Sequence, residues 1–434
     1  MKRLFPLLTE AFRKGVEGAN PDSAVPAFLR KDGGRLLAKG DRGWIDISPA
    51  AGGKLIVIAT GKAAPGMYRA ATSVTGIPQT GIVVSNDPAD RLPGARHLVG
   101  THPFPDESSV DAAEVVYATV CGLAEEDSIL YLLSGGSSSM VCLPEREISL
   151  EEKVETTRVL MLAGASIEEL NTVRKAISRV KGGKLAGVLG TGRGCVLVIS
   201  DVPGNDLSVI GSGPLYSGKV GGDPLRVMKN LSVTEKVPPA VVRFLREGRD
   251  GKDAASPVKE IPHIIIADNS RALVCAASCL ASQGYRIEVA KEQFSKEALT
   301  TGTRLGRAAL KIRESKEHEK TALLAGGETV VRVRGGGKGG RNQEMAIGAA
   351  LSLSGTGGVV GLCAGTDGTD GNSGAAGGFF DGSLIEHARS MGADYERYLA
   401  NSDSYTFMQK TGYCLVTGPT GTNVMDLFLC LIHR

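Results

Sequence analysis

The strongest constraint on the fold of this chain is a unit that recurs in both halves: a short apolar run, a polar loop and a segment with helical periodicity. In the first half the apolar runs are KLIVIAT (54–60), GIVVS (81–85), SILYLLS (128–134) and CVLVIS (195–200). These runs are continuous rather than alternating, as is typical of strands covered on both faces. The repetition predicts an α/β fold with a doubly wound, mostly parallel sheet, whose ligands bind at the carboxyl ends of the strands.

Helical periodicity is found between these runs, for example over 110–123 and 168–189. The first fifteen residues, MKRLFPLLTEAFRKG, also have the pattern of an amphipathic helix. They are too short and too charged for a signal peptide.

A polar, turn-rich segment, 246–260, separates the two halves, and we place the domain boundary there. The sequence therefore predicts one domain over 1–248 and a smaller one over 260–434. Because GGETVVRVR has the pattern of a hairpin, a mixed sheet is expected in the second domain. Its expected strands are HIIIAD (263–268), YRIEVA (285–290), TALLAGG (321–327), TVVRVR (329–334), GVVGLCAG (358–365) and YCLVTG (413–418).

Composition excludes several classes of function. Lys and Arg number 50 and Asp and Glu 47, so the net charge of +3 is too small to predict a nucleic-acid or membrane partner. The sequence has no apolar run of about 18 residues, and its eight cysteines show no CxxC pair. We therefore expect a cytoplasmic protein, monomeric or homodimeric, whose partners are small molecules. Glycine is abundant, at 58 of 434 residues, which predicts many close backbone approaches.

The segment GGGKGG (335–340) matches the GxGxxG pattern of dinucleotide-binding loops. It follows the expected strand TVVRVR and opens a helix-like segment, and Asp367 lies further on after another strand. Five glycines in six positions match many patterns, however. Lys338 and Arg341 also place two cations at a helix N-terminus, which favours a multiply charged anion bound by these side chains and by backbone N–H groups.

Two loops of the first half indicate phosphate chemistry. SGGSSS (134–139) follows an apolar strand, and its small residues and hydroxyls suit a nest around phosphate oxygens. The alternative is a helix N-cap, which one serine would satisfy. Lys62 follows the first strand at the start of a helix, where a cation is unfavourable against the helix dipole. That position favours a functional role.

Acidic and polar loops follow other strands. Asp201 could hold a metal ion or orient a hydroxyl, whereas Asp206 is equally compatible with a turn. TDGTDGN (366–372) contains Asp367 and Asp370 and favours Mg²⁺ or ribose contacts over turns alone, and Glu328 lies at another strand end. No Glu stands at the twelfth position of this loop, which excludes an EF-hand.

Asn171 and Arg174 share a helical face and could reach a substrate carboxylate, although basic helices are also commonly solvated. His102, in GTHPFPD, could act as a base, but two neighbouring prolines favour a structural role in the loop.

Six segments occur in order along the chain: VIATGKAAPGM, LLSGGSSSM, LNTVRKAISRVKGGKLA, VISDVPGNDLSVIGSGP, GGETVVRVRGGGKGGRNQEMA and AGTDGTDGNSGAAGG. Together they resemble the class II glycerate kinases, the glycerate 2-kinase family with a C-terminal MOFRL domain. The resemblance covers nearly the whole chain. It implies a Rossmann-like N-terminal domain, a smaller α/β domain and an active-site cleft between them.

The resemblance implies ATP-dependent phosphorylation of D-glycerate to 2-phosphoglycerate with Mg²⁺, and it carries the family's catalytic lysine and arginine onto Lys62 and Arg341. Members have also been labelled hydroxypyruvate reductases, so an NAD(P)H-dependent reductase is the alternative. The apolar tail LFLCLI (427–432) departs from the family pattern, and it could dock on the body or on a second subunit. We expect nucleotide contacts from Ser134, Gly135, Gly136, Ser137, Ser138, Gly211, Gly213, Lys338 and Gly339, substrate contacts from Asn171, Arg174, Asn342 and Glu344, and metal contacts from Asp201, Asp367 and Asp370.

Overall fold

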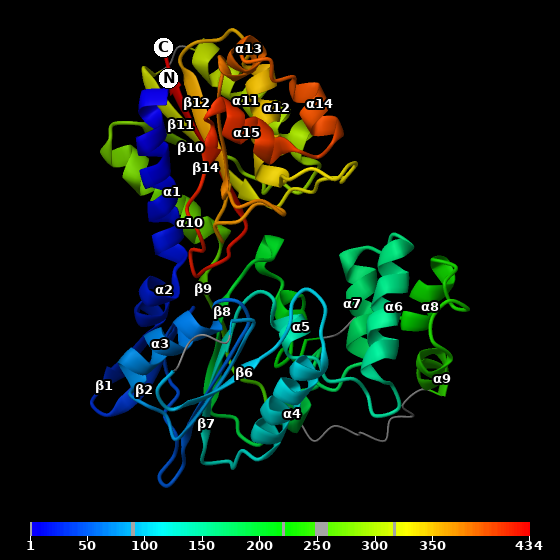
Figure 1. Ribbon diagram of the computed structural model, residues 1–434. Helices are drawn as coiled ribbons and strands as arrows, with labels where there is room; N and C mark the ends of the chain where they lie inside the picture. The colour runs from blue at the N-terminus through cyan, green and yellow to red at the C-terminus, as the bar shows by residue number, and fades with distance from the viewer. Residues whose placement is uncertain (1, 88–91, 219–221, 248–258, 316–317) are drawn as a thin grey trace. The chain divides into compact units, whose positions relative to one another are not determined.

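The computed structural model describes residues 2–87, 92–218, 222–247, 259–315 and 318–434 (Figure 1). The chain divides into two compact units, one of residues 24–266 and one that joins residues 1–23 to 267–434. This division differs from the expected domains in two ways. The N-terminal segment belongs with the C-terminal half, and the segment after the polar linker belongs with the first half. Most of that linker lies outside the described residues.

The larger unit contains a six-stranded sheet in the order β6-β5-β4-β7-β8-β9. In chain order this is third, second, first, fourth, fifth and sixth, the strand order of a Rossmann fold. The expected parallel pairing is present between β4 and both of its neighbours, and in β5–β6 and β7–β8. HIIIAD, which we assigned to the second domain, is therefore the sixth strand of the first sheet. The bounds are β4 (Leu55–Thr60), β5 (Thr80–Ser85), β6 (Ala95–Val99), β7 (Ser128–Leu133), β8 (Gly194–Ile199) and β9 (His263–Ala267).

Burial explains why these strands form a core. Every residue of β7 and β8 is buried, as the continuous apolar runs predict for central strands of a two-sided sheet. A separate apolar cluster joins helices α6 to α9, which Figure 1 shows grouped together. A small antiparallel sheet, β1 (Leu29–Asp32), β2 (Arg35–Gly40) and β3 (Gly43–Asp46), precedes the main one. The helices are α2 (Pro21–Phe28), α3 (Ala64–Thr75), α4 (Glu107–Cys121), α5 (Ser137–Met140), α6 (Leu150–Leu162), α7 (Ile167–Ala176), α8 (Pro224–Asn230) and α9 (Pro239–Glu247).

The second unit contains a mixed six-stranded sheet in the order β10-β11-β15-β12-β13-β14, as expected. Among the strands described in this sheet, only β10 and β11 pair in parallel. The apolar tail forms β15, which pairs antiparallel with β11 on one side and β12 on the other. The tail is thus a central strand of its own unit, and its continuous apolar character reflects burial on both faces. The bounds are β10 (Arg286–Val289), β11 (Lys320–Gly327), β12 (Val359–Gly365), β13 (Gly377–Asp381), β14 (Cys414–Leu415) and β15 (Asp426–His433).

Helices cover both faces of this mixed sheet (Figure 1). α1 and α10 pack together on one face, and α11 and α12 pack together on the other. None of the helices in the described part of the chain has the length and apolar character that crossing a bilayer requires. The bounds are α1 (Phe5–Ala19), α10 (Asn269–Ser282), α11 (Ala298–Ser315), α12 (Arg341–Ser352), α13 (Leu384–Ser390), α14 (Tyr395–Ala400) and α15 (Ser404–Thr411).

Two local predictions are wrong. TVVRVR (329–334) is irregular, and its Val330 makes only an isolated bridge to Glu297. Val330 and Val333, which would lie on opposite faces of a strand, are both largely exposed, so neither face is held by a core. The helix expected over 168–189 ends with α7 at Ala176, before the paired glycines of KGGK.

Candidate active site

The two loops that the sequence singled out in the first half lie where the strand order reverses. Strands β4 and β7 are neighbours, and successive strands continue from them toward opposite edges of the sheet. Open α/β sheets bind ligands outside the carboxyl ends of the strands at this reversal. Gly61 and Lys62 follow β4, and the serine loop, residues 134–139, follows β7.

Backbone contacts join these two loops directly. The Lys62 N–H donates to the carbonyl of Gly135 (2.8 Å), and the Ala63 N–H donates to Ser134 Oγ (3.1 Å). Gly61 has φ +112°, and a Cβ there would come within 2.5 Å of the Ser134 carbonyl, so this approach requires glycine. The Lys62 side chain remains exposed to solvent.

The middle of the serine loop lies against Lys62 and His102. Gly136 has φ +83°, and a Cβ on it would lie 3.2 Å from Lys62 Cγ and 3.3 Å from the His102 ring. Ser137 Oγ donates to Thr60 Oγ1 (2.8 Å), which fixes the loop on the end of β4. Burial and the charges of Lys62 and Arg174 lower the pKa of His102 below its usual value, which favours the neutral form of its ring.

A third loop adds a hydroxyl that the sequence reading missed. Gly211, Ser212 and Gly213 have successive φ values of 56°, 64° and 59°, all in the left-handed region. This unusual backbone brings Ser212 Oγ within 2.8 Å of Ser138 Oγ. The predicted positions Gly211 and Gly213 therefore shape the loop, while Ser212 makes the contact. A lone serine between glycines gives no sequence signal beyond a turn.

Arg174 joins the same cluster from α7. Its Nη2 donates to Ser138 Oγ (2.9 Å). Burial lowers the pKa of the guanidinium, which nevertheless stays positively charged. Asn171 lies one turn earlier on α7 and is buried, as the shared face predicts. The alternative of a solvated basic face is thus wrong for these two residues.

Two further buried cations, Lys153 and Lys181, surround Arg174. Lys153 Nζ donates to the carbonyls of Arg174 (3.2 Å) and Ile177 (2.7 Å), at the end of α7. Lys181 Nζ donates to the carbonyls of Ser138 and Val141 (the latter at 3.2 Å), at the end of α5. Burial lowers the pKa of Lys153 to about 8 and that of Lys181 to about 7. Lysines in a polar segment usually face solvent, so no pattern in the sequence selects these two.

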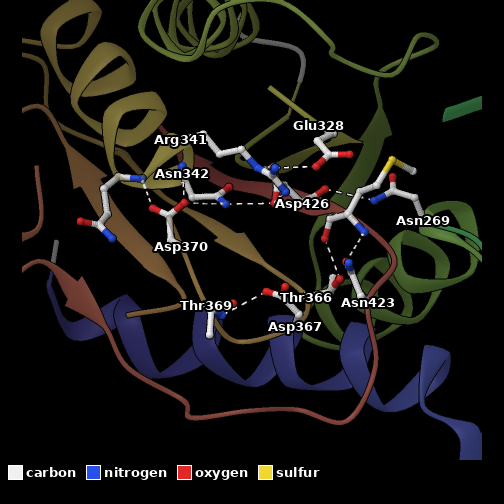
Figure 2. Close-up of polar contacts among 12 residues, drawn as sticks. Asn269, Glu328, Arg341, Asn342, Thr366, Asp367, Thr369, Asp370, Asn423 and Asp426 are labelled. Atoms are coloured by element: carbon white, nitrogen blue, oxygen red, sulfur yellow. Dashed lines mark hydrogen bonds and ion pairs between the residues drawn. The ribbon is translucent and has the colours of Figure 1, made fainter. Parts of the chain in front are cut away.

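The predicted arginine of the second unit lies in a network of carboxylates (Figure 2). Arg341 is the first residue of α12, and its Nε and Nη2 donate to Asp426 Oδ2 (2.6 Å) and Oδ1 (3.0 Å). Its Nη1 donates to Glu328 Oε1 (2.5 Å). Burial alone would lower the pKa of Arg341, but Asp426 and Glu328 outweigh it and raise that pKa above its usual value.

Asp426, which the sequence reading missed, is positioned by the central strand β15. In the antiparallel registers it pairs with Gly327 at the end of β11 and with Gly365 at the end of β12. Asn269 Nδ2 donates to the carbonyls of Val424 (2.9 Å) and Asp426 (3.0 Å) and fixes this part of the strand. The only signal in the sequence is a carboxylate at the start of an apolar run.

Asp370 caps helix α12. Its Oδ1 accepts the Asn342 N–H (3.0 Å) and its Oδ2 accepts the Gln343 N–H (2.9 Å). Burial raises the pKa of Asp370 to about 7 despite these bonds. Asn342 also donates from Nδ2 to Asp426 Oδ1 (3.0 Å), so it belongs to the arginine network. Burial, followed by the neighbouring Glu297 and Asp370, raises the pKa of Glu344 to about 7.

The GGGKGG loop does not have the geometry of a dinucleotide fingerprint. No strand leads directly into it, since β11 ends at Gly327. The N–H groups of residues 337–340 donate in turn to the Asn401 carbonyl (3.0 Å), Asp403 Oδ1 (3.0 Å), Asn372 Oδ1 (2.9 Å) and Ser404 Oγ (3.3 Å). The expected phosphate contacts from the backbone of Lys338 and Gly339 are therefore replaced by protein acceptors, while the Lys338 side chain is exposed.

Two of the predicted metal ligands, Asp367 and Asp370, have local structural roles within their own unit. Among the described residues, no group of three or more His, Cys, Asp or Glu side chains is arranged to hold a metal ion. Both oxygens of Asp370 are occupied by the helix cap, and Asp367 Oδ1 accepts the Thr369 N–H (3.0 Å) in a local turn. Asp201 differs, because a Cβ on Gly135 would lie 1.9 Å from its Oδ2. The Asp201 carboxylate thus borders the serine loop.

A Rossmann-ordered sheet with lysine, arginine and serine hydroxyls at its strand reversal defines an α/β protein built to bind anionic groups. Comparison with known protein families supports this assignment. Residues 7–246 match a domain of unknown function (DUF4147), and residues 321–426 match the MOFRL family. The D-glycerate 2-kinase of Thermotoga maritima is 37% identical over 98% of both chains.

Solved structures agree as well. The crystal structure of a glycerate kinase from Thermotoga maritima superimposes with a TM-score of 0.85 at 34% identity, covering 100% of both chains.

A relative from Agrobacterium vitis with the provisional name hydroxypyruvate reductase is 33% identical over 88% of this chain and 87% of its own. The chain belongs to the glycerate kinase family that joins a DUF4147 domain to a MOFRL domain.

Proposed function

We propose that the protein catalyses ATP-dependent phosphorylation of D-glycerate to 2-phosphoglycerate. The observation that best supports this is the cluster at the strand reversal, where Lys62, Arg174 and the serine loop converge. These groups are donors, and the substrates of this reaction are anions. The relatives named glycerate 2-kinase provide the choice of D-glycerate and of the 2-hydroxyl.

Phosphoryl transfer depends mainly on positioning and on neutralising the charge of the transferred group. Lys62, exposed at the end of β4, neutralises charge on that group, and N–H groups of the serine loop bind phosphate oxygens. Arg174, oriented by Ser138, holds the carboxylate of D-glycerate. Arg341, which the family resemblance implies as catalytic, is proposed as the second cation of the reaction.

The nucleotide is proposed to bind with Mg²⁺, which would neutralise charge on its terminal phosphates. Mg²⁺ is commonly held by one or two carboxylates together with substrate phosphates. Asp201 is the described carboxylate that suits this role, because it borders the serine loop. Asp367 and Asp370 remain candidates as well, although Asp370 also caps α12.

The function is tested by ADP release from purified protein with D-glycerate and ATP, with the phosphorylated product resolved by NMR. We expect 2-phosphoglycerate and dependence on Mg²⁺. A titration of the same protein with NADH tests the reductase alternative. Failure to phosphorylate D-glycerate, together with micromolar NADH binding, would replace the kinase by the reductase. The cytoplasmic location, the oligomeric state and the cleft between the domains stay predictions.

A further inference from the structure

The two carboxylates on Arg341 contact different parts of its guanidinium group. Asp426 accepts hydrogen bonds from Nε and Nη2 through its two oxygens, whereas Glu328 accepts one from Nη1 through a single oxygen. A guanidinium can form two parallel hydrogen bonds on each of two edges. Asp426 occupies one edge, so a phosphate or carboxylate of a ligand would take the edge that begins at Nη1. Glu328 now lies there.

The two carboxylates also differ in how deeply they are buried and in how many partners they have. The Asp426 side chain is 0% exposed, and it also accepts from Asn342. The Glu328 side chain is 40% exposed. A buried, multiply bonded carboxylate is costly to displace, while an exposed one can turn into water and regain its hydration.

The backbone of Glu328 would stay in place during such an exchange. Its N–H donates to the Phe294 carbonyl (2.8 Å), and the preceding Gly327 has φ +148° and would place a Cβ only 2.1 Å from that carbonyl. Release of Arg341 therefore needs only rotation of the glutamate side chain.

We propose that Glu328 is an internal stand-in for the anionic ligand of Arg341: it holds the guanidinium edge that the ligand takes, while Asp426 fixes the opposite edge. Glu328 thus sets the affinity for that ligand, and Asp426 is a positioning residue. The inference rests on the proposed function for the identity of the ligand, which is either the phosphate of the nucleotide or the carboxylate of D-glycerate.

The test compares kcat and KM for both substrates in wild type, Glu328→Gln and Glu328→Asp. Gln keeps the shape and hydrogen bonding but loses the charge, and Asp keeps the charge but withdraws it by one methylene. We expect both variants to lower the KM of one substrate by about two- to fivefold, the range that an exposed ion pair allows, with kcat unchanged. Whichever KM falls identifies the ligand.

Glu314→Gln is the matched control, because it also removes one exposed carboxylate. Glu314 lies near the end of α11, about 24 Å along the helix axis from the first residue of that helix. We expect its KM values to equal those of wild type. An unchanged or raised KM for both substrates in Glu328→Gln would overturn the proposal. A lower KM in Glu328→Gln but not in Glu328→Asp would also overturn it. That pattern would mean that the lost negative charge acts at long range and not through contact with Arg341. Asp426→Asn is expected to lower kcat instead, since Arg341 loses its fixed orientation; a change confined to KM would contradict the positioning role.

A second readout separates this inference from the proposed function. Thermal stabilisation by inorganic pyrophosphate and by D-glycerate is measured without turnover. Stronger stabilisation of Glu328→Gln than of wild type by one of these probes supports the stand-in role even if the protein does not phosphorylate D-glycerate. Equal stabilisation by both probes in the two proteins would exclude it.

Discussion

The two candidate sites of this protein use cations in opposite ways. At the strand reversal of the larger unit, Lys62 is exposed, and Arg174 is held by the hydroxyl of Ser138. In the smaller unit, Arg341 is already paired with Asp426 and Glu328. The first arrangement presents positive charge to a ligand. The second keeps a cation paired within a network that includes Asp426, the first residue of the central strand β15.

This difference predicts how function and stability are coupled. An exposed lysine can be removed without disturbing packing, whereas a buried ion pair cannot lose one partner without leaving the other uncompensated. Variants at Lys62 should therefore affect catalysis alone, and variants around Asp426 should affect both catalysis and folding.

The largest effect is expected from Asp426→Ala. It removes a fully buried carboxylate that accepts from Arg341 and Asn342, and breaking such a pair costs about 3–5 kcal/mol. Urea unfolding followed by circular dichroism measures the loss. A loss below about 1 kcal/mol would show that the network contributes little to stability, and the contrast between the two sites would fail.

Arg341→Lys separates charge from geometry in the same network. Lysine keeps the positive charge but cannot make the two parallel bonds to Asp426. We expect a loss on the order of 2–4 kcal/mol in transition-state stabilisation, measured as kcat/KM for D-glycerate phosphorylation. Near-normal kcat/KM in this variant would remove the catalytic role of Arg341.

Lys62→Ala is the corresponding test at the strand reversal. Loss of one electrostatic stabiliser predicts a fall in kcat of at least about 100-fold. Because the side chain is exposed, the melting temperature should stay within about 1 °C of wild type. A folded variant with normal turnover would contradict the assignment, and a large drop in melting temperature would contradict the proposed independence from stability.

The strand-reversal site was largely predictable because its parts are local in sequence. Continuous apolar runs predict buried parallel strands, and polar loops directly after β4 and β7 must lie at one edge of the sheet. Lys62 and the serine loop could thus be selected from their positions alone. Ser212 and Lys181 could not, because their contacts depend on left-handed backbone and on burial that no local pattern encodes.

The arginine network was less predictable because its members are far apart in sequence. Asp426 reaches Arg341 only because the apolar tail becomes a central strand, and the sequence left that tail unplaced. The capping role of Asp370 was missed for a related reason. An aspartate in a glycine-rich turn suggests a ligand, but the start of α12 lies close enough for it to cap the helix instead.

The two regions should also respond to pH in opposite directions, which is the smallest expected effect. Burial lowers the pKa of Lys181 from 10.5 to about 7, so the unfolded chain binds more protons than the folded one between these values. Stability from this residue therefore rises with pH over about 7 to 10. Burial raises the pKa of Asp370 from 3.8 to about 7, so its folded form binds more protons, and its contribution is lost as pH rises through that interval.

Two variants isolate these slopes. We expect Lys181→Met to flatten the rise in unfolding free energy above pH 7, and Asp370→Asn to flatten the fall below pH 7, each by at most about 1.4 kcal/mol per pH unit. The single tryptophan, Trp44, lies in the unit of residues 24–266, so its fluorescence in urea follows the lysine variant, while circular dichroism follows the aspartate variant. Because each variant also alters hydrogen bonds, the slope against pH is compared rather than the absolute stability. Slopes identical to wild type in both variants would mean that neither group keeps its shifted pKa in solution, and the electrostatic contrast between the two units would be lost.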